Sequence, residues 1–322
     1  MSVPDLGRLG FGAAGIGNLY KAMSDDVAAA TLEAGWDEGL RYFDTAPHYG
    51  IGLSERRTGA FLSTKPRDEF VISTKVGRLL EPAANPSGAR DTEGFDVRAD
   101  WVRRWDPSEA GVRRSIEDSL ERTGLDRIDI AFLHDPDAYD LEAGISQALP
   151  ALEKLRAEGL VKAIGVGSNS SDALRDCVQA ADLDIIMLAG RYSLLEQPAA
   201  TDLMPLCLER GVGIINVGVY NSGLLARPVV PEDANYNYAP APADILARAR
   251  ALAACCDEFG VELPAAALQF AASHPAVKSV VVGASKPGQI IETARRMSAQ
   301  IPAEMWTAMV SRGLLDEGLI HG

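Results

Sequence analysis

Residues 39–50 read Gly39-Leu40-Arg41-Tyr42-Phe43-Asp44-Thr45-Ala46-Pro47-His48-Tyr49-Gly50. The aromatic and apolar run at 41–46 is typical of a short buried strand. Asp44 lies near the end of this run, and the following Pro47 and Gly50 favour a turn that presents the Tyr49 hydroxyl. The segment therefore predicts a strand that carries an acid, followed by a turn that carries a phenol.

Short β-rich runs of this kind recur along the chain, and amphipathic stretches of helical length separate nearly all of them. We expect strands at 9–14, 41–46, 70–75, 129–134, 163–168, 185–189, 213–218 and 279–283. Clear helices are expected at 25–39, 108–124, 143–159 and 202–210. Alternating strands and helices indicate parallel βαβ units, and eight strands are the number that closes a barrel. The predicted fold is α/β, a (β/α)₈ TIM barrel formed by a single domain over residues 1–322.

Helix-end signals support this pattern. In the sequence Asp106-Pro107-Ser108-Glu109, Asp106 is a candidate N-cap, with proline at the first helical position and an acid at the third. Glycines also follow the last periodic residue of three predicted helices, where a C′ glycine is expected, at Gly39, Gly124 and Gly159.

Two connections are longer than a barrel requires, at 78–106 after the third strand and at 220–243 after the seventh. Both follow the carboxyl end of a strand, the face on which barrel enzymes build their sites. The first contains Trp101 and Trp105, and the second contains Asn235-Tyr236-Asn237-Tyr238. Because these aromatic side chains would otherwise be exposed, we expect ordered loops that cover the site.

The charge balance restricts the class of partner. The chain of 322 residues has 31 Lys and Arg against 45 Asp and Glu, a net charge of −14. Such a surface repels nucleic acid and anionic lipid, and it favours neutral or cationic small molecules. We expect no nucleic-acid or membrane partner, and either a monomer or a homo-oligomer.

No apolar run reaches the length of a membrane span, and Asp5 and Arg8 interrupt the start of the chain where a signal peptide would be apolar. We therefore expect a cytoplasmic protein. Its 4 cysteines are too few to crosslink a chain of this length, and their spacing matches no zinc site. Buried free thiols and no metal centre are expected.

Three of the predicted strands end in ionisable residues: Asp44, Lys75 and His134. A single residue of this kind is more often a turn former, a surface lysine or a core histidine. In a parallel barrel, however, the carboxyl ends of the strands meet at one rim, so these side chains are expected to lie close together and near Tyr49.

This set, with its flanking residues, resembles the aldo-keto reductases, a family of (β/α)₈ barrels. The resemblance covers the whole chain, from Gly10-Phe11-Gly12 through residues 165–169 to Gly283-Ala284-Ser285-Lys286-Pro287. Residues 189–197 and 220–225 look most like the sugar-oxidising, aldose 1-dehydrogenase branch of the family.

The resemblance implies roles for the four residues in hydride transfer to or from a nicotinamide. Tyr49 would exchange the alcohol proton, Lys75 would lower its pKa, Asp44 would position Lys75, and His134 would hydrogen-bond the substrate oxygen. To act as a base near pH 7, a tyrosine needs its pKa lowered by about 3 units, roughly 4 kcal/mol. One cation supplies about 1–3 units, so Lys75 alone is marginal, and the charge of an oxidised nicotinamide would help.

The cofactor is expected to be NAD, with NADP as an alternative. By resemblance its site comprises Gly12, Ala13, Asp44, Ser168, Asn169, Asn221, Ser222, Gly223, Leu225, Gly283, Ala284, Ser285, Gln289 and Glu292. Residues 10–15 also match G-x-G-x-x-G, but no full strand precedes them and no helix follows directly, so a Rossmann turn is disfavoured. Two departures concern the nicotinamide: Ala189 replaces a common glutamine, and residues 216–219 contain no tyrosine to stack on the ring.

NADP-dependent relatives place Lys, Ser and Arg where this chain has Gly283, Ala284 and Gln289. A 2′-phosphate without these partners loses its charge-assisted hydrogen bonds, which favours NAD. Lys286 or Arg295 could replace the missing cations.

The substrate is expected to be a small sugar or aldehyde. Asp135 follows the histidine where relatives that reduce apolar aldehydes often have an aromatic residue, and His48 precedes Tyr49. Such polar groups suit a polyhydroxylated substrate, although Asp135 could equally form a turn. The leading hypothesis is oxidation of the C1 hydroxyl of an aldose such as L-fucose to a lactone.

The alternatives are pyridoxal 4-dehydrogenase activity or general aldehyde reduction with the same four residues. The fold also serves as a redox-sensing subunit of ion channels, but the chain has no obvious partner-binding tail.

Overall fold

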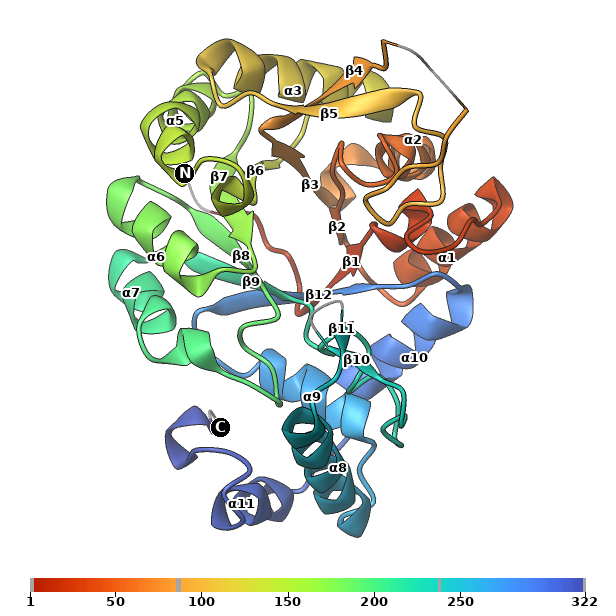
Figure 1. Cartoon of the computed structure of the whole chain (residues 1–322), viewed down its shortest axis with the longest axis vertical. Helices are drawn as coiled ribbons and strands as arrows, with labels where there is room; N and C mark the ends of the chain where they lie inside the picture. The colour runs from red at the N-terminus through yellow and green to blue at the C-terminus, as the bar shows by residue number, and fades with distance from the viewer. Residues whose placement is uncertain (1–2, 85–87, 237–238, 321–322) are drawn as a thin grey trace.

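Eight parallel strands close into a barrel in the computed structural model, which describes residues 3–84, 88–236 and 239–320. Around the barrel the order is β1-β12-β9-β8-β7-β6-β3-β2, so the first strand pairs with the last (Figure 1). The strands are β1 (Leu9–Gly12), β2 (Tyr42–Asp44), β3 (Val71–Val76), β6 (Ile130–His134), β7 (Ala163–Ser168), β8 (Ile185–Ala189), β9 (Gly213–Val217) and β12 (Val277–Gly283). All eight predicted strands are confirmed, each end within two residues. The first glycine-rich segment is thus barrel strand β1 and no Rossmann turn.

The strands fill two layers of core because successive side chains point to opposite faces. In β6, Ile130 and Phe132 belong to the apolar cluster inside the barrel. Ala131 and Leu133 belong to the larger cluster between the strands and the helices. The barrel interior is therefore packed with side chains at one end, and a site has to lie at a rim.

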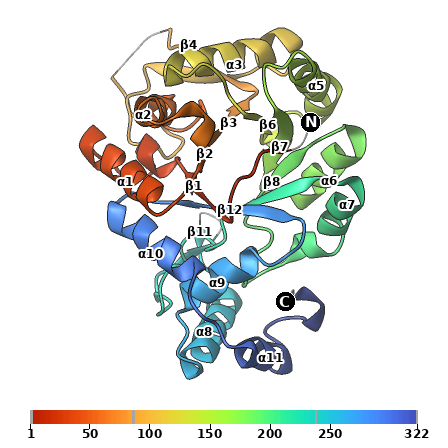
Figure 2. The same ribbon diagram turned by 180° about the vertical axis from the view of Figure 1, so that it is seen from behind.

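Helices surround the barrel on all sides (Figures 1 and 2). They are α1 (Asp25–Asp37), α2 (Leu53–Leu62), α3 (Glu109–Thr123), α4 (Leu141–Ala143), α5 (Leu149–Ala157), α6 (Ser171–Ala180), α7 (Leu203–Arg210), α8 (Ala243–Glu258), α9 (Leu263–Ala271), α10 (Pro287–Met297) and α11 (Ala303–Ser311). The predicted helix at 143–159 is divided by a π-helical turn at Gly144–Ala148. None of the helices in the described residues is both long and apolar enough to span a membrane.

The predicted N-cap of α3 is wrong by two residues, although the predicted helix bounds of 108–124 agree with Glu109–Thr123 within one residue. Ser108, not Asp106, is the N-cap: its hydroxyl accepts a hydrogen bond from the Gly111 N–H at 3.1 Å. Asp106 instead accepts hydrogen bonds from the Ser108 N–H at 3.1 Å and from the Ser108 hydroxyl at 2.6 Å, and so orients the true cap. The predicted C′ glycines are confirmed by left-handed φ angles of 86°, 68° and 79° at Gly39, Gly124 and Gly159.

Both long connections contain strands of their own. The first forms an antiparallel hairpin of β4 (Arg78–Pro82) and β5 (Trp101–Trp105), which lies beside α3 (Figure 1). The second contains β10 (Asn235–Tyr236) paired with β11 (Ala239–Pro240), whereas Asn237 and Tyr238 lie outside the described residues.

The expectation that the first long connection would be ordered and would bury its tryptophans is only partly correct. Trp105 stacks on Tyr139 with ring centroids 4.9 Å apart. Trp101, however, remains 46% exposed because it lies on the outer part of the hairpin.

The cysteines are buried and free, as predicted, at Cys177, Cys207, Cys255 and Cys256. Burial raises the pKa of the Cys177, Cys207 and Cys256 thiols to about 12. At neutral pH these thiols are protonated and act as small apolar core residues.

The contact between α2 and α3 leaves no space for a side chain at Gly59. A Cβ atom there would lie 2.0 Å from the carbonyl oxygen and 2.4 Å from the Cα atom of Thr123. We expect Gly59→Ala to lower the free energy of unfolding by about 1–3 kcal/mol, because the two helices must separate. Urea denaturation followed by circular dichroism measures this change.

Gly288→Ala is the matched control, because Gly288 lies in α10 and a Cβ atom there would meet nothing within 4 Å. This variant should be as stable as the original protein or more stable by up to about 1 kcal/mol, since alanine favours helix. Equal stability of the two variants would contradict the close helix contact.

Candidate active site

A cavity of about 580 Å³ opens at the carboxyl ends of the barrel strands. Its lining includes Tyr49, Lys75 and His134, which are three of the four predicted catalytic residues. Both predicted substrate residues, His48 and Asp135, also line it. The expected meeting of the strand ends at one rim is therefore confirmed.

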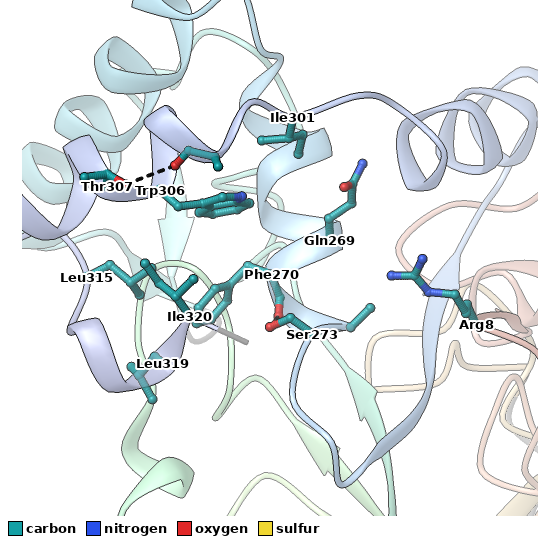
Figure 3. A pocket seen from close by; sticks show the side chains of 12 residues that line it. Arg8, Gln269, Phe270, Ser273, Ile301, Trp306, Thr307, Leu315, Leu319 and Ile320 are labelled. Carbon is teal, nitrogen blue, oxygen red and sulfur yellow. Dashed lines mark hydrogen bonds between the residues drawn. The ribbon is translucent and has the colours of Figure 1, made fainter. Parts of the chain in front are cut away.

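A larger cavity of about 680 Å³ lies at the other end of the barrel. Its lining comes from α9, α11 and the end of the chain, with Phe270 and Trp306 facing Ile320 and with Arg8 to one side (Figure 3). Arg8 directly precedes β1, which places this cavity at the amino ends of the strands. It contains none of the predicted catalytic groups, so the smaller cavity is the candidate active site.

A buried ion pair lies at the base of this site. The Lys75 ammonium group is 2.6 Å from Asp44 Oδ2 and donates a second hydrogen bond to the Thr45 carbonyl at 3.1 Å. Ser73 donates to the other carboxylate oxygen of Asp44 at 2.7 Å, because Asp44 and Ser73 are paired in register between β2 and β3. Burial lowers the pKa of Lys75, but Asp44 and Tyr49 outweigh this effect and the pKa is raised overall. Lys75 is therefore a cation at neutral pH.

Tyr49 lies above this pair, in the turn that follows β2. Its N–H donates to the Ala46 carbonyl at 3.1 Å, and Lys75 Nζ lies 4.6 Å from the centre of its ring. Burial raises the pKa of Tyr49, Lys75 lowers it and Asp44 raises it again. The net pKa is above the ordinary value, so the expected lowering by Lys75 is present but is exceeded by desolvation. In the protein alone, Tyr49 is a proton donor.

The rings of two histidines, His48 and His134, lie beside the Tyr49 ring. The His134 ring meets the Tyr49 ring edge-on at 5.9 Å, and the His48 ring lies 5.5 Å from the His134 ring. Burial, with Arg78 second, lowers the pKa of His134 well below 6.5 and that of His48 to about 2. Both imidazoles are therefore neutral at pH 7, and each has one N–H to donate.

The cations behind the histidines come from the β4–β5 hairpin. Arg103 forms a buried pair with Asp91, at 2.6 and 3.1 Å, and donates to the His48 carbonyl at 2.9 Å. Arg78 donates to Asp135 Oδ2 at 2.5 Å, and the same oxygen lies 3.5 Å from His134 Nε2. In the sequence, Arg78 begins the long connection at 78–106 and Arg103 lies within it. No sequence pattern indicates a partner for either arginine.

One wall of the cavity was missed by sequence reasoning. Tyr20 donates its N–H to the Gly94 carbonyl at 2.8 Å, and Leu19 pairs with Phe95 in an isolated antiparallel bridge. This contact brings Glu93, Gly94 and Phe95 over the cavity, so the expected cover is confirmed for the first long loop. Since Leu19 and Phe95 are 76 positions apart in the chain, no local pattern could have revealed their contact.

The second long loop does not line the cavity within the described residues. It is tied instead to the loop after β8: Asn221 and Tyr236 both donate to the Glu196 carboxylate, at 2.9 and 2.8 Å.

Some of the predicted cofactor residues line the cavity. Ser168 and Asn169 are there, together with Ala189, Val217 and Gly218, where the expected glutamine and tyrosine are absent. Across the β1–β12 pairing, Gly12 is in register with Gly283, and Ala13 donates to the Asp44 carbonyl at 2.8 Å.

Glycines lie in the wall of the cavity on this side of the barrel. Gly167 and Gly218 both line it, and neither has a side chain that could enter it. The backbone is therefore accessible from the cavity at these positions, which fits the close approach of a flat nicotinamide ring.

The remaining cofactor residues lie outside the cavity, on the loop after β9 and at the start of α10. Asn221, Ser222 and Gly223 have left-handed φ angles of 46°, 58° and 90°, whereas the Leu225 side chain is buried in the core. In α10, Gln289 Oε1 accepts hydrogen bonds from the Ser285 N–H at 2.8 Å and hydroxyl at 3.1 Å. Glu292 pairs with Arg296 at 2.8 Å, and Ala284 is buried. These groups could hold the far end of an extended ligand.

In residues 3–84, 88–236 and 239–320, no three His, Cys, Asp or Glu side chains gather as a metal site. The polar groups of the cavity suit proton transfer and hydrogen bonding to a substrate oxygen.

Comparison with known proteins agrees with this chemistry. The model of the aldo/keto reductase family matches residues 8–312. D-threo-aldose 1-dehydrogenase from Pseudomonas sp is 54% identical, over 95% of this chain and 94% of the relative. Pyridoxal 4-dehydrogenase from Microbacterium luteolum is 41% identical, also over 95% of this chain and 94% of the relative.

Among solved structures, the holo form of an aldo-keto reductase from Bacillus halodurans has a TM-score of 0.74 and 26% identity. The similarity covers 96% of this chain and 92% of that structure. With a family match over nearly the whole chain and a shared barrel, this protein belongs to the aldo/keto reductase family of NAD(P)-dependent oxidoreductases.

Proposed function

We propose that the protein oxidises the C1 hydroxyl of a cyclic aldose such as L-fucose to a lactone, with NAD as its preferred cofactor. The observation that carries this proposal is the arrangement of Tyr49, Lys75, Asp44 and His134 at one polar cavity. The 54% identity to a D-threo-aldose 1-dehydrogenase supports the choice of an aldose.

The proposed mechanism assigns one task to each residue. His134, neutral at pH 7, donates its N–H to the C1 oxygen and orients it. Tyr49 takes the hydroxyl proton, and Lys75 stabilises the phenolate while Asp44 holds Lys75 in place. A bound oxidised nicotinamide supplies the hydride acceptor and a positive charge that favours the phenolate. In the reverse direction Tyr49 returns the proton to a carbonyl oxygen.

The charges around the cavity favour an uncharged, polyhydroxylated substrate. Three cations and four carboxylates lie in or behind its wall: Lys75, Arg78, Arg103, Asp44, Asp91, Glu93 and Asp135. A sugar phosphate would meet a nearly balanced but carboxylate-rich surface, whereas hydroxyl groups find donors and acceptors there. His48 and Asp135 are the proposed substrate-binding residues.

Pyridoxal oxidation is the second candidate, and one feature of the cavity favours it. Phe95 lies edge-on to His48 at 5.3 Å and tilted to Tyr49 at 6.1 Å, which gives the cavity an aromatic wall. A flat pyridine ring could pack against this wall. General aldehyde reduction would use the same four residues.

The start of α10 favours NAD. The Ser285 N–H and hydroxyl, which could otherwise bind a 2′-phosphate, are used by the Gln289 amide oxygen. Arg295, which could have compensated for the missing cations, is paired with Glu262. A single domain over residues 1–322, a cytoplasmic location, and action as a monomer or homo-oligomer stay predictions from the sequence.

Replacement of Tyr49 by phenylalanine tests the mechanism. We expect Tyr49→Phe to lower kcat for L-fucose oxidation by about 10²–10⁴-fold, because proton transfer is lost. Binding of NAD, measured by quenching of protein fluorescence, should be unchanged. A variant that keeps most of its rate would show that another group moves the proton.

The pH dependence should separate the two directions. Because oxidation needs the Tyr49 phenolate and burial raises the pKa of Tyr49, kcat/KM for oxidation should rise from pH 7 to pH 10. Reduction needs the protonated phenol and should stay constant from pH 6 to pH 9. Neither direction should show a titration near pH 6.5, because His134 and His48 have far lower pKa values. An inflection near pH 6.5 would mean that a histidine in the site changes its charge.

Cofactor preference can be altered at Gln289. We expect the original enzyme to have the higher kcat/KM with NAD, and Gln289→Arg to shift the NAD to NADP ratio toward NADP by about tenfold or more. The control Arg295→Gln should leave the ratio unchanged, since Arg295 is held by Glu262. A preference of the original enzyme for NADP would contradict the proposal and indicate Lys286 as the phosphate partner.

A further inference from the structure

Asp135 is held at the cavity in an unusual backbone conformation. Its φ and ψ angles are 43° and 59°, the left-handed region that aspartate tolerates better than most residues. Its N–H donates to the Gly167 carbonyl at 2.8 Å, and Pro136 begins a short 3₁₀ turn directly after it. The side chain therefore leaves the end of β6 in a fixed direction, next to His134.

Arg78 holds the carboxylate of Asp135 from behind. Its guanidinium donates to Asp135 Oδ2 at 2.5 Å, and the side chain is buried. The guanidinium carbon lies 5.2 Å from the centre of the Tyr139 ring, and Tyr139 in turn stacks on Trp105. Because β4, an aromatic stack and an ion pair all restrain Arg78, Asp135 Oδ2 has little freedom to move.

The second oxygen of Asp135 is left for a ligand. Within the described part of the chain no hydrogen bond reaches Oδ1, while the side chain is 33% exposed and lines the cavity. An ionised carboxylate only accepts hydrogen bonds, so its partner in the cavity must be a donor.

The position of Asp135 relative to His134 identifies that donor. Asp135 Oδ2 lies 3.5 Å from His134 Nε2, the nitrogen on the cavity side, since His134 Nδ1 is fully buried. A substrate oxygen bound by His134 therefore has its neighbouring groups beside Asp135. In a cyclic aldose, C1 has two such neighbours, the ring oxygen and the C2 hydroxyl. The ring oxygen has no hydrogen and would be repelled, whereas the C2 hydroxyl can donate.

We infer that Asp135, held in place by Arg78, binds the hydroxyl group on the carbon next to the reacting carbon. Arg78 is then a positioning residue for substrate selection. The inference rests on the proposed function only in requiring His134 to bind the reacting oxygen. It narrows the substrate class to 2-hydroxy aldehydes and aldoses.

Two matched substrate pairs isolate this hydroxyl. D-arabinose and 2-deoxy-D-ribose differ only at C2 and report on oxidation with NAD. Lactaldehyde and propanal differ only at the α-carbon and report on reduction with NADH. We expect kcat/KM to favour the hydroxylated member of each pair by about 10–100-fold, as expected for a hydrogen bond to a charged group.

Variants assign the preference to the two residues. Asp135→Ala should reduce the preference to less than about threefold, mainly by slowing the hydroxylated substrates. Arg78→Met should reduce it in the same way, and Arg78→Lys should restore part of it. Arg104→Met is the matched control, because Arg104 lies on β5 of the same hairpin but pairs with Glu81 at the surface. Its preference should equal that of the original enzyme, and thermal melting would show that all variants fold.

The outcomes separate the inference from the proposed function. A preference near one in the original enzyme, or one that survives both Asp135→Ala and Arg78→Met, would overturn the inference. Loss of the preference in Arg104→Met as well would also overturn it, because the hairpin would then act only through stability. If the aldoses are not oxidised, the proposed function fails, and the ratio of lactaldehyde to propanal still decides the inference.

Discussion

The ion pair between Lys75 and Asp44 is the interaction around which the site is built. Two charges removed from water cost several kcal/mol each unless their remaining hydrogen bonds are satisfied. Here Ser73 and the Thr45 carbonyl supply those bonds, and the register of β2 against β3 brings them within reach. The pair in turn places a cation against the Tyr49 ring, where the charge of Lys75 lowers the pKa of the buried phenol.

The removal of water around this pair has two effects, one on the ion pair and one on the pKa of Tyr49. The same burial that strengthens the contact between Lys75 and Asp44 raises the pKa of Tyr49 above that of a free phenol. In the protein alone, Tyr49 is therefore protonated and can donate a proton. For Tyr49 to accept a proton, additional positive charge has to stabilise its phenolate form. A nicotinamide that is cationic only when oxidised fits this requirement, because the charge is present only in the direction that needs it.

The β4–β5 hairpin determines the character of the cavity more than any barrel strand does. Two of its arginines, Arg103 and Arg78, restrain His48 and Asp135, and their charges add to the effect of burial in lowering the pKa values of His48 and His134. The stretch between its strands also supplies Glu93 and Phe95 to the cavity wall. A barrel of this type can change its substrate through such an insertion while the four residues at its carboxyl rim stay in place.

The sequence by itself determined the eight strands, four of the helices, and the positions of Asp44, Lys75 and His134 at strand ends with Tyr49 in the following turn, because periodicity and strand-end position are local properties. It did not reveal the contact of Leu19 with Phe95, or the pairs of Arg78 with Asp135 and Arg103 with Asp91. It also gave no indication of how far burial raises the pKa of Tyr49. These features depend on which distant segments meet and on how much water they exclude, and only the closed barrel with its hairpin decides both.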